Sequence, residues 1–272
     1  MGARVLSQML DDEKTQQALE FAIEVAVQSG DIAMKYFRRP LCIDNKAGEG
    51  DFDPVTEADR EIEAFIRERI SETYPKHGIV GEEHADKSGT ENCTWLVDPI
   101  DGTSGYMIGS PMWGTLLGLL DEGKCAFGLM HQPFVQETFI GSADGAYVID
   151  RDGKRQIRTS ETQDIASSVL CCTHRSMFTT TRDQLAYDRV ADACKLSRLG
   201  TDCWGYALLA HGFVDVVIEN GLKAYDAVPL VPIVAAAGGL MTDWNGNAAL
   251  AGGRVVASAN AVLHEKVLKL LA

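Results

Sequence analysis

Two aspartates bracket a proline at the point where an apolar strand is expected to end. Residues 95–97 predict a buried strand, and Asp98 and Asp101 follow it directly. Pro99 fixes its own φ and keeps the preceding residue extended, so a stiff turn holds both carboxylates. Rigid carboxylate oxygens at a strand end suit Mg²⁺ binding. Asp, Pro and Gly are also common turn formers, so this stretch alone is equally compatible with a solvated turn.

Two further acidic residues, Glu82 and Asp226, favour the metal site, because such a site needs carboxylates from separate segments. Glu82 follows the apolar residues 79–80, although alone it is more typical of a charged loop. Asp226 stands directly before the apolar helix predicted at 227–237 and is expected to be its N-cap, where a buried carboxylate would need a cation or donors. Asp59 is expected in the first turn of a helix capped by Thr56.

Gly102 and Thr103 follow the aspartate pair at a predicted helix start. Backbone N–H groups at such a start bind phosphate oxygens. Cys203 beside Asp202 has no evident base, which argues against a thiol nucleophile. The residues therefore favour metal-assisted hydrolysis of a phosphate ester.

The overall charge constrains the partners. Asp and Glu number 39 against 25 Lys and Arg among 272 residues, giving a formal net charge of −14. This field repels nucleic acid and anionic membranes, so neither is expected as a partner. A small phosphate ester remains compatible, because carboxylates that recruit divalent cations invert the field locally.

Cysteine usage and hydropathy predict a soluble, cytoplasmic protein. The seven cysteines show no paired spacing, which favours buried thiols in a reducing compartment. No secretory signal pattern is evident at the N-terminus, and no apolar run approaches the roughly 20 residues of a membrane span.

The periodicity predicts a mixed α/β protein. Residues 13–39 read as a long helix interrupted near Ser29 and Gly30, and residues 45–54 as a loop. Short central runs predict an antiparallel-leaning sheet, followed by alternating strands and helices from about Ser167. An exposed turn at 150–153 suggests an N-terminal α+β half at 1–150 and a C-terminal α/β half at 151–272.

These motifs resemble those of the inositol monophosphatase superfamily. They are Gly-Glu-Glu at 81–83, Asp-Pro-Ile-Asp-Gly-Thr at 98–103, and Tyr-Asp with an apolar helix ending in Ala-Gly-Gly at 225–239. The resemblance spans the chain from Thr-Glu-Ala-Asp at 56–59 to the terminal helix. It implies a layered αβαβα sandwich, usually a homodimer, with two or three Mg²⁺ ions where the two halves meet.

The resemblance also assigns metal ligands. Glu82, Asp98 and the carbonyl of Ile100 match the ligands of a first ion, and Asp98, Asp101 and Asp226 match those of a second. A third, weaker ion would use Glu82 and water.

The catalytic roles follow from the same resemblance. Glu82 and Thr103 match the pair that orients the attacking water, and Asp59 matches a carboxylate that supports them. Gly102 and Thr103 match the amides that hold the phosphate.

Local segments look like the histidinol-phosphatase branch of this superfamily. They lie at 52–60, 113–116 and 201–203, although Ser104 stands where the branch often has a basic residue. The expected reaction is hydrolysis of L-histidinol phosphate in histidine biosynthesis, with Asp202 and Glu219 contacting the cationic end of the substrate. A helix-capping role for Asp202 is the simpler alternative. Inositol 1-phosphate or another small phosphate ester is the alternative substrate, and a non-catalytic binding protein is a remote one.

Overall fold

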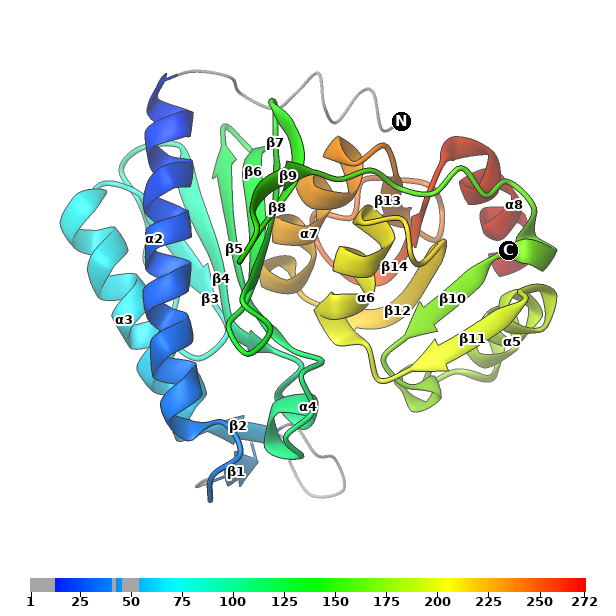
Figure 1. The fold of residues 1–272 in the computed structure, drawn as a ribbon, viewed down its shortest axis with the longest axis horizontal. Helices are drawn as coiled ribbons and strands as arrows, with labels where there is room; N and C mark the ends of the chain where they lie inside the picture. The colour runs from blue at the N-terminus through cyan, green and yellow to red at the C-terminus, as the bar shows by residue number, and fades with distance from the viewer. Residues whose placement is uncertain (1–12, 41–42, 46–53) are drawn as a thin grey trace.

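The computed structural model describes residues 13–40, 43–45 and 54–272, which form five stacked layers (Figure 1). Helices α2 and α3 cover one face of a seven-stranded sheet, and α6 and α7 separate this sheet from a five-stranded one. Helices α5 and α8 cover the outer face of the second sheet. The predicted αβαβα sandwich is confirmed.

The first sheet has strand order β3-β4-β5-β6-β7-β8-β9. Only the β3–β4 pair is parallel, so the predicted antiparallel character is confirmed. Its strands are β3 (Gly78–Gly81), β4 (Cys93–Asp101), β5 (Gly114–Asp121), β6 (Lys124–Gln132), β7 (Glu137–Ser142), β8 (Gly145–Asp150) and β9 (Gly153–Gln156).

The outer helices of this sheet are α2 (Glu13–Tyr36) and α3 (Glu57–Thr73). The predicted interruption near Ser29 and Gly30 is wrong, because α2 runs through both residues. The hydroxyl of Ser29 donates to Ala26 O at 2.8 Å. A Cβ on Gly30 would lie 2.7 Å from Nε2 of His131, so this glycine permits close packing on β6.

Helix α7 (Ala224–Ala236) packs its backbone directly on the first sheet, although it contains Pro229 and Pro232. The sheet offers glycines where the helix crosses it. A Cβ on Gly128 would lie 1.9 Å from Pro229 O, and one on Gly141 would lie 2.2 Å from Pro232 C. These absent side chains fix how deeply α7 lies, and therefore where Asp226 in its first turn is held.

The second sheet has strand order β11-β10-β12-β14-β13 and mixes parallel with antiparallel pairs. Its strands are β10 (Val169–Cys172), β11 (Leu196–Leu199), β12 (Val216–Leu222), β13 (Leu240–Asp243) and β14 (Gly253–Ser258). The remaining elements are β1 (Ile43–Asn45), β2 (Pro54–Thr56), α4 (Thr103–Met107), η1 (Ile165–Ser167), η2 (Arg175–Met177), α5 (Thr181–Ala193), α6 (Asp202–Ala210) and α8 (Ala261–Leu271).

The proposed boundary at 150–153 coincides with the turn between β8 and β9. The first sheet therefore continues to Gln156, and α7 from the C-terminal part of the chain packs on it. The division into halves at residue 150 stays a prediction. The loop predicted at 45–54 falls largely on residues 46–53, which lie outside the described residues.

Candidate active site

An irregularity in strand pairing sets the positions of Asp98 and Asp101. The β4–β5 register shifts between them, from Asp98 opposite Leu116 to Asp101 opposite Gly114. Pro99 lies in this irregularity, where its missing N–H costs the ladder no hydrogen bond, and its carbonyl accepts from Thr115 Oγ1 at 2.9 Å. The aspartates are thus fixed by sheet pairing as well as by the proline.

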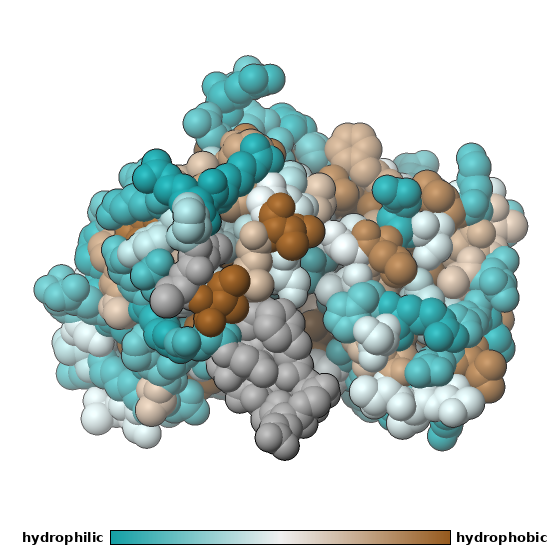
Figure 2. Space-filling view, turned by 90° about the horizontal axis from the view of Figure 1, so that it is seen from below, coloured by the Kyte–Doolittle hydropathy of each residue, from teal (hydrophilic) through white to brown (hydrophobic). Residues whose placement is uncertain are grey.

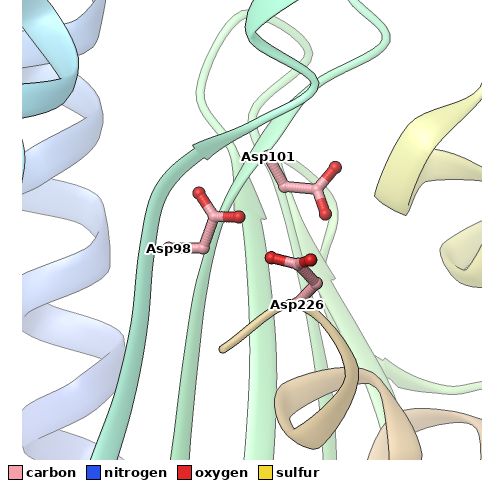
Figure 3. A group of neighbouring side chains, drawn as sticks. All are labelled: Asp98, Asp101 and Asp226. Atoms are coloured by element: carbon pink, nitrogen blue, oxygen red, sulfur yellow. The ribbon is translucent and has the colours of Figure 1, made fainter. Parts of the chain in front are cut away.

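Asp226 approaches from the opposite side, in the first turn of α7. The expectation that it is the N-cap is wrong, because the helix begins at Ala224 and Lys223 is the N-cap. Asp226 instead reaches back, and its Oδ2 accepts from Lys223 N at 2.7 Å. Asp226 still lies where its carboxylate faces those of Asp98 and Asp101 (Figure 3).

The three aspartates form a group suited to a metal ion. One carboxylate oxygen from each lies within 4.8 Å of the others, and no second such group of three occurs within the described residues. Asp98 Oδ1 is buried without a hydrogen-bond partner among those residues. Burial and the neighbouring carboxylates raise the pKa of Asp98 and Asp101, and burial raises the pKa of Asp226 to about 7. An orphaned buried oxygen amid mutually repelling hard-oxygen donors fits a divalent cation.

Glu82 follows β3 directly and lies near the three aspartates but outside their group. After burial, its charge is the largest influence that raises the pKa of Asp98, and it also raises the pKa of Asp226. The carbonyl of Ile100 accepts from Thr103 Oγ1 at 3.1 Å. The metal-ligand roles of Glu82 and Ile100 stay predictions, as do those of the aspartates.

Thr103 contacts both Asp59 and the segment that carries Asp98 and Asp101. The hydroxyl of Thr103 is 3.4 Å from Asp59 Oδ1. Thr103 is the first residue of α4, and Gly102, with φ +90°, is the N-cap of this helix. Asp59 is fully buried and accepts from Thr56 N at 2.9 Å, which confirms the predicted cap of α3. Burial raises the pKa of Asp59 to about 6. This arrangement matches a hydroxyl oriented by a buried carboxylate, and the catalytic roles stay predictions.

Asp202 joins the site from the first residue of α6. The alternative that it caps this helix is wrong, because Thr201 is the N-cap. Its φ of +45° is uncommon for a residue with a side chain. The next residue, Cys203, donates its N–H to Asp101 Oδ1 at 3.1 Å, a contact that sequence reasoning missed because it joins residues far apart in the chain. Burial raises the pKa of Asp202 to about 6.

Glu219 on β12 lies behind the site at 2% exposure. Its carboxylate accepts from the hydroxyl of Thr173 and, at 3.1 Å, from the hydroxyl of Tyr206. Burial raises the pKa of Glu219 to about 7. Thr173 also lies near Asp202, and its influence on the pKa of Asp202 opposes the larger effect of burial.

A cavity of about 450 Å³ is lined by Thr103 and Asp202 together with Thr173 and His174. Figure 2 shows the molecule from below, where hydrophilic side chains cover much of the surface on the left and on the right. Among the described residues that line this cavity, Asp202 is the only acidic one and none is Lys or Arg. This cavity has room for the alcohol part of a phosphate ester whose phosphate lies at the three aspartates.

The sequence profile of the inositol monophosphatase family matches residues 14–272, and the chain belongs to that family. Together with the aspartate cluster, this makes it a metal-dependent phosphomonoesterase acting on small phosphate esters.

Two curated relatives and one solved structure illustrate the breadth of this family. The bifunctional phosphatase IMPL2, chloroplastic, of Arabidopsis thaliana is 37% identical over 91% of this chain and 72% of its own. The histidinol-phosphatase of Mycobacterium tuberculosis is 31% identical over 84% and 87%. An inositol monophosphatase structure from Zymomonas mobilis superposes with a TM-score of 0.83 at 33% identity, over 96% of this chain and 99% of that one. The chain is therefore similar both to a protein named as a histidinol-phosphatase and to one named as an inositol monophosphatase.

The raised pKa values predict how Mg²⁺ should affect stability. Acids whose folded pKa is raised stabilise the fold fully below their unfolded pKa and lose that contribution as pH rises through the folded value. Asp59 and Asp226 place this window between about pH 4 and pH 7. We expect the rise in Tm on adding excess MgCl₂ to protein in EDTA to be larger at about pH 8 than at about pH 5. Differential scanning fluorimetry measures this, and a pH-independent rise would contradict the electrostatic account.

Proposed function

We propose that this phosphomonoesterase uses Mg²⁺ to hydrolyse L-histidinol phosphate to L-histidinol, a step of histidine biosynthesis. The observation that carries the proposal is Asp202, a half-buried acidic side chain on the wall of the cavity that Thr103 also lines. Histidinol phosphate carries an ammonium and an ionisable imidazole beyond its phosphate. Its non-reacting end therefore favours a wall with a carboxylate and without Lys or Arg.

The reaction requires the phosphate to be held at the three aspartates. Asp98, Asp101 and Asp226, with Glu82 and the Ile100 carbonyl, would hold two or three Mg²⁺ ions. When bound, these ions neutralise phosphate charge, lower the pKa of a water and stabilise the departing alkoxide.

The other side chains position the reactants. Thr103, with its hydroxyl near Asp59, would orient the attacking water together with Glu82. The N–H groups of Gly102 and Thr103 at the start of α4 would hold phosphate oxygens. No covalent intermediate on the protein is needed, because water attacks the phosphorus directly as the alcohol leaves.

The alternative substrate is inositol 1-phosphate. Glu219 favours it, because a carboxylate can accept hydrogen bonds from sugar hydroxyls, and the Zymomonas mobilis structure supports it by similarity. Glu219 already accepts from Thr173 and Tyr206, and it is not among the residues that line the cavity. Asp202 lies directly on the wall and therefore distinguishes the two substrates better. A non-catalytic binding protein is disfavoured, since every predicted ligand position carries an oxygen donor.

The test is the Asp202→Asn variant, because asparagine removes the charge and tolerates a positive φ. We expect kcat/KM for histidinol phosphate to fall about 10- to 100-fold while that for inositol 1-phosphate changes little. Asp144→Asn, at an exposed turn, serves as the control and should change neither value. A wild-type preference for inositol 1-phosphate, or an equal loss on both substrates in Asp202→Asn, would contradict the assignment.

Two further predictions concern the assembly and location of the protein. A homodimer and a cytoplasmic location are proposed from the family resemblance and the composition. Within the described residues, no helix combines the length and apolarity that crossing a bilayer requires.

A further inference from the structure

Helix α3 carries a second buried carboxylate, Glu63, which the mechanism above does not use. Its side chain is fully buried, one helical turn beyond Asp59. Its Oε1 accepts from Arg67 Nε at 2.6 Å and from His84 N at 3.3 Å, and its Oε2 accepts from Glu83 N at 2.6 Å. The imidazole Nδ1 of His84 lies 3.5 Å from Oε1. Glu63 therefore binds the two backbone amides that directly follow Glu82.

Arg67 also binds the loop that follows Glu82. While its Nε contacts Glu63, its Nη1 donates to Ala85 O at 3.0 Å and its Nη2 donates to His84 O at 3.1 Å. The planar guanidinium can make these contacts together because its donors diverge in a fixed fork. The Glu63–Arg67 pair thus binds two N–H groups and two carbonyls of the segment after β3.

The residue before Glu82 fits this arrangement. A Cβ on Gly81 would lie 2.3 Å from Glu63 Oε1, so a larger residue at this position would displace the carboxylate. A buried charge is costly unless it is paired and hydrogen-bonded, and Glu63 has both an ion pair and amide donors. Every one of these partners lies on its own helix or on the loop that carries Glu82.

We propose that Glu63, with Arg67, is a positioning residue that holds Glu82 in its metal-binding geometry. The proposal rests on the proposed function, in which Glu82 binds metal and orients water with Thr103. Helix α3 then positions both members of that pair, because Asp59 approaches Thr103 while Glu63 holds the loop of Glu82. Outer contacts of this kind change metal affinity or activity by about 10- to 100-fold.

The test is Glu63→Gln, which keeps the side-chain shape. Glutamine has one side-chain oxygen, so it can accept at the position of Oε1, from Arg67 Nε, or at that of Oε2, from Glu83 N, but not at both. Its NH₂ group then faces another hydrogen-bond donor. We expect Mg²⁺ affinity, measured by isothermal titration calorimetry without substrate, to fall about 10-fold or more. The Mg²⁺ concentration for half-maximal phosphate release should rise by the same factor, and excess Mg²⁺ should restore most of kcat.

Two further variants keep the test decisive. Glu68→Gln changes an exposed residue of the same helix and should match the wild type in both measurements. Arg67→Lys keeps a charge beside Glu63 but loses the fork, and we expect it to weaken Mg²⁺ binding by a smaller factor. If Glu63→Gln does not fold, the Mg²⁺ affinity of Arg67→Lys tests the proposal instead.

Wild-type Mg²⁺ affinity in a folded Glu63→Gln protein would overturn the proposal, even if its Tm is lowered, because the pair would then have only a structural role. If Glu63→Gln does not fold, wild-type Mg²⁺ affinity in Arg67→Lys would overturn it in the same way. A wild-type protein that neither binds Mg²⁺ nor releases phosphate would instead refute the proposed function.

Discussion

Asp98→Asn is expected to lower kcat for phosphate release by at least about 1000-fold while making the metal-free protein more stable. The loss of activity follows because Asp98 is predicted to bind two ions at once. The gain in stability follows because Asp98 is buried beside Asp101, Asp226 and Glu82, with a pKa raised by burial and by their charges. An amide removes that repulsion, and each kcal/mol gained should raise Tm by about 2 to 4 °C.

Asp59→Asn provides the comparison for this variant. Asp59 is also buried with a raised pKa, but it contacts Thr103 rather than the aspartate cluster. We expect it to lower kcat by only about 10- to 100-fold and to leave Mg²⁺-induced stabilisation in place. Near-wild-type turnover by Asp98→Asn at saturating Mg²⁺ would remove Asp98 from the site.

Gly128→Ala is expected to cost more than about 3 kcal/mol of unfolding free energy, or to prevent folding. The added Cβ would lie 1.9 Å from Pro229 O, a backbone atom inside α7 that cannot rotate away. Moving the helix would also displace Asp226 in its first turn. Any folded Gly128→Ala protein should therefore show weakened Mg²⁺-dependent stabilisation as well as a lower denaturation midpoint.

Gly118→Ala is the matched control on the neighbouring strand. Its Cβ would lie 3.2 Å from Pro229 Cα, a contact that a small shift relieves. We expect a cost of about 1 kcal/mol in urea denaturation and little change in Mg²⁺ response. Equal costs for both variants would contradict the claim that contact with α7 sets the depth of the helix.

Much of the fold could be predicted because its signals are local. Hydrophobic runs predict the central strands of the first sheet, and Thr56 predicts the start of α3 through its capping hydrogen bond. The break expected near Gly30 was wrong, because the sequence cannot show that a glycine accommodates His131 from another layer. The start of α7 was also misplaced. An acidic residue is as favourable at the third helical position as at the N-cap, because from there its carboxylate can accept a hydrogen bond from the backbone N–H of the N-cap, here Lys223 N.

The site could be predicted in part for the same physical reason. Asp98 and Asp101 flank a proline at the end of a strand, which is visible in sequence. Their meeting with Asp226 was expected from its place beside an apolar helix and from the family motifs. The contacts of Cys203 N with Asp101 and of Glu63 with Glu83 N join segments distant in the chain. Neither contact leaves a periodic or compositional signal, because backbone amides are common to every residue type.

The most direct test of the central claim is phosphate release from histidinol phosphate and inositol 1-phosphate by the purified protein, titrated with Mg²⁺ and compared with EDTA. The account predicts release that requires Mg²⁺, is lost in EDTA, and has a higher kcat/KM for histidinol phosphate. Release that is undiminished in EDTA would contradict the claim that Asp98, Asp101 and Asp226 hold catalytic metal ions.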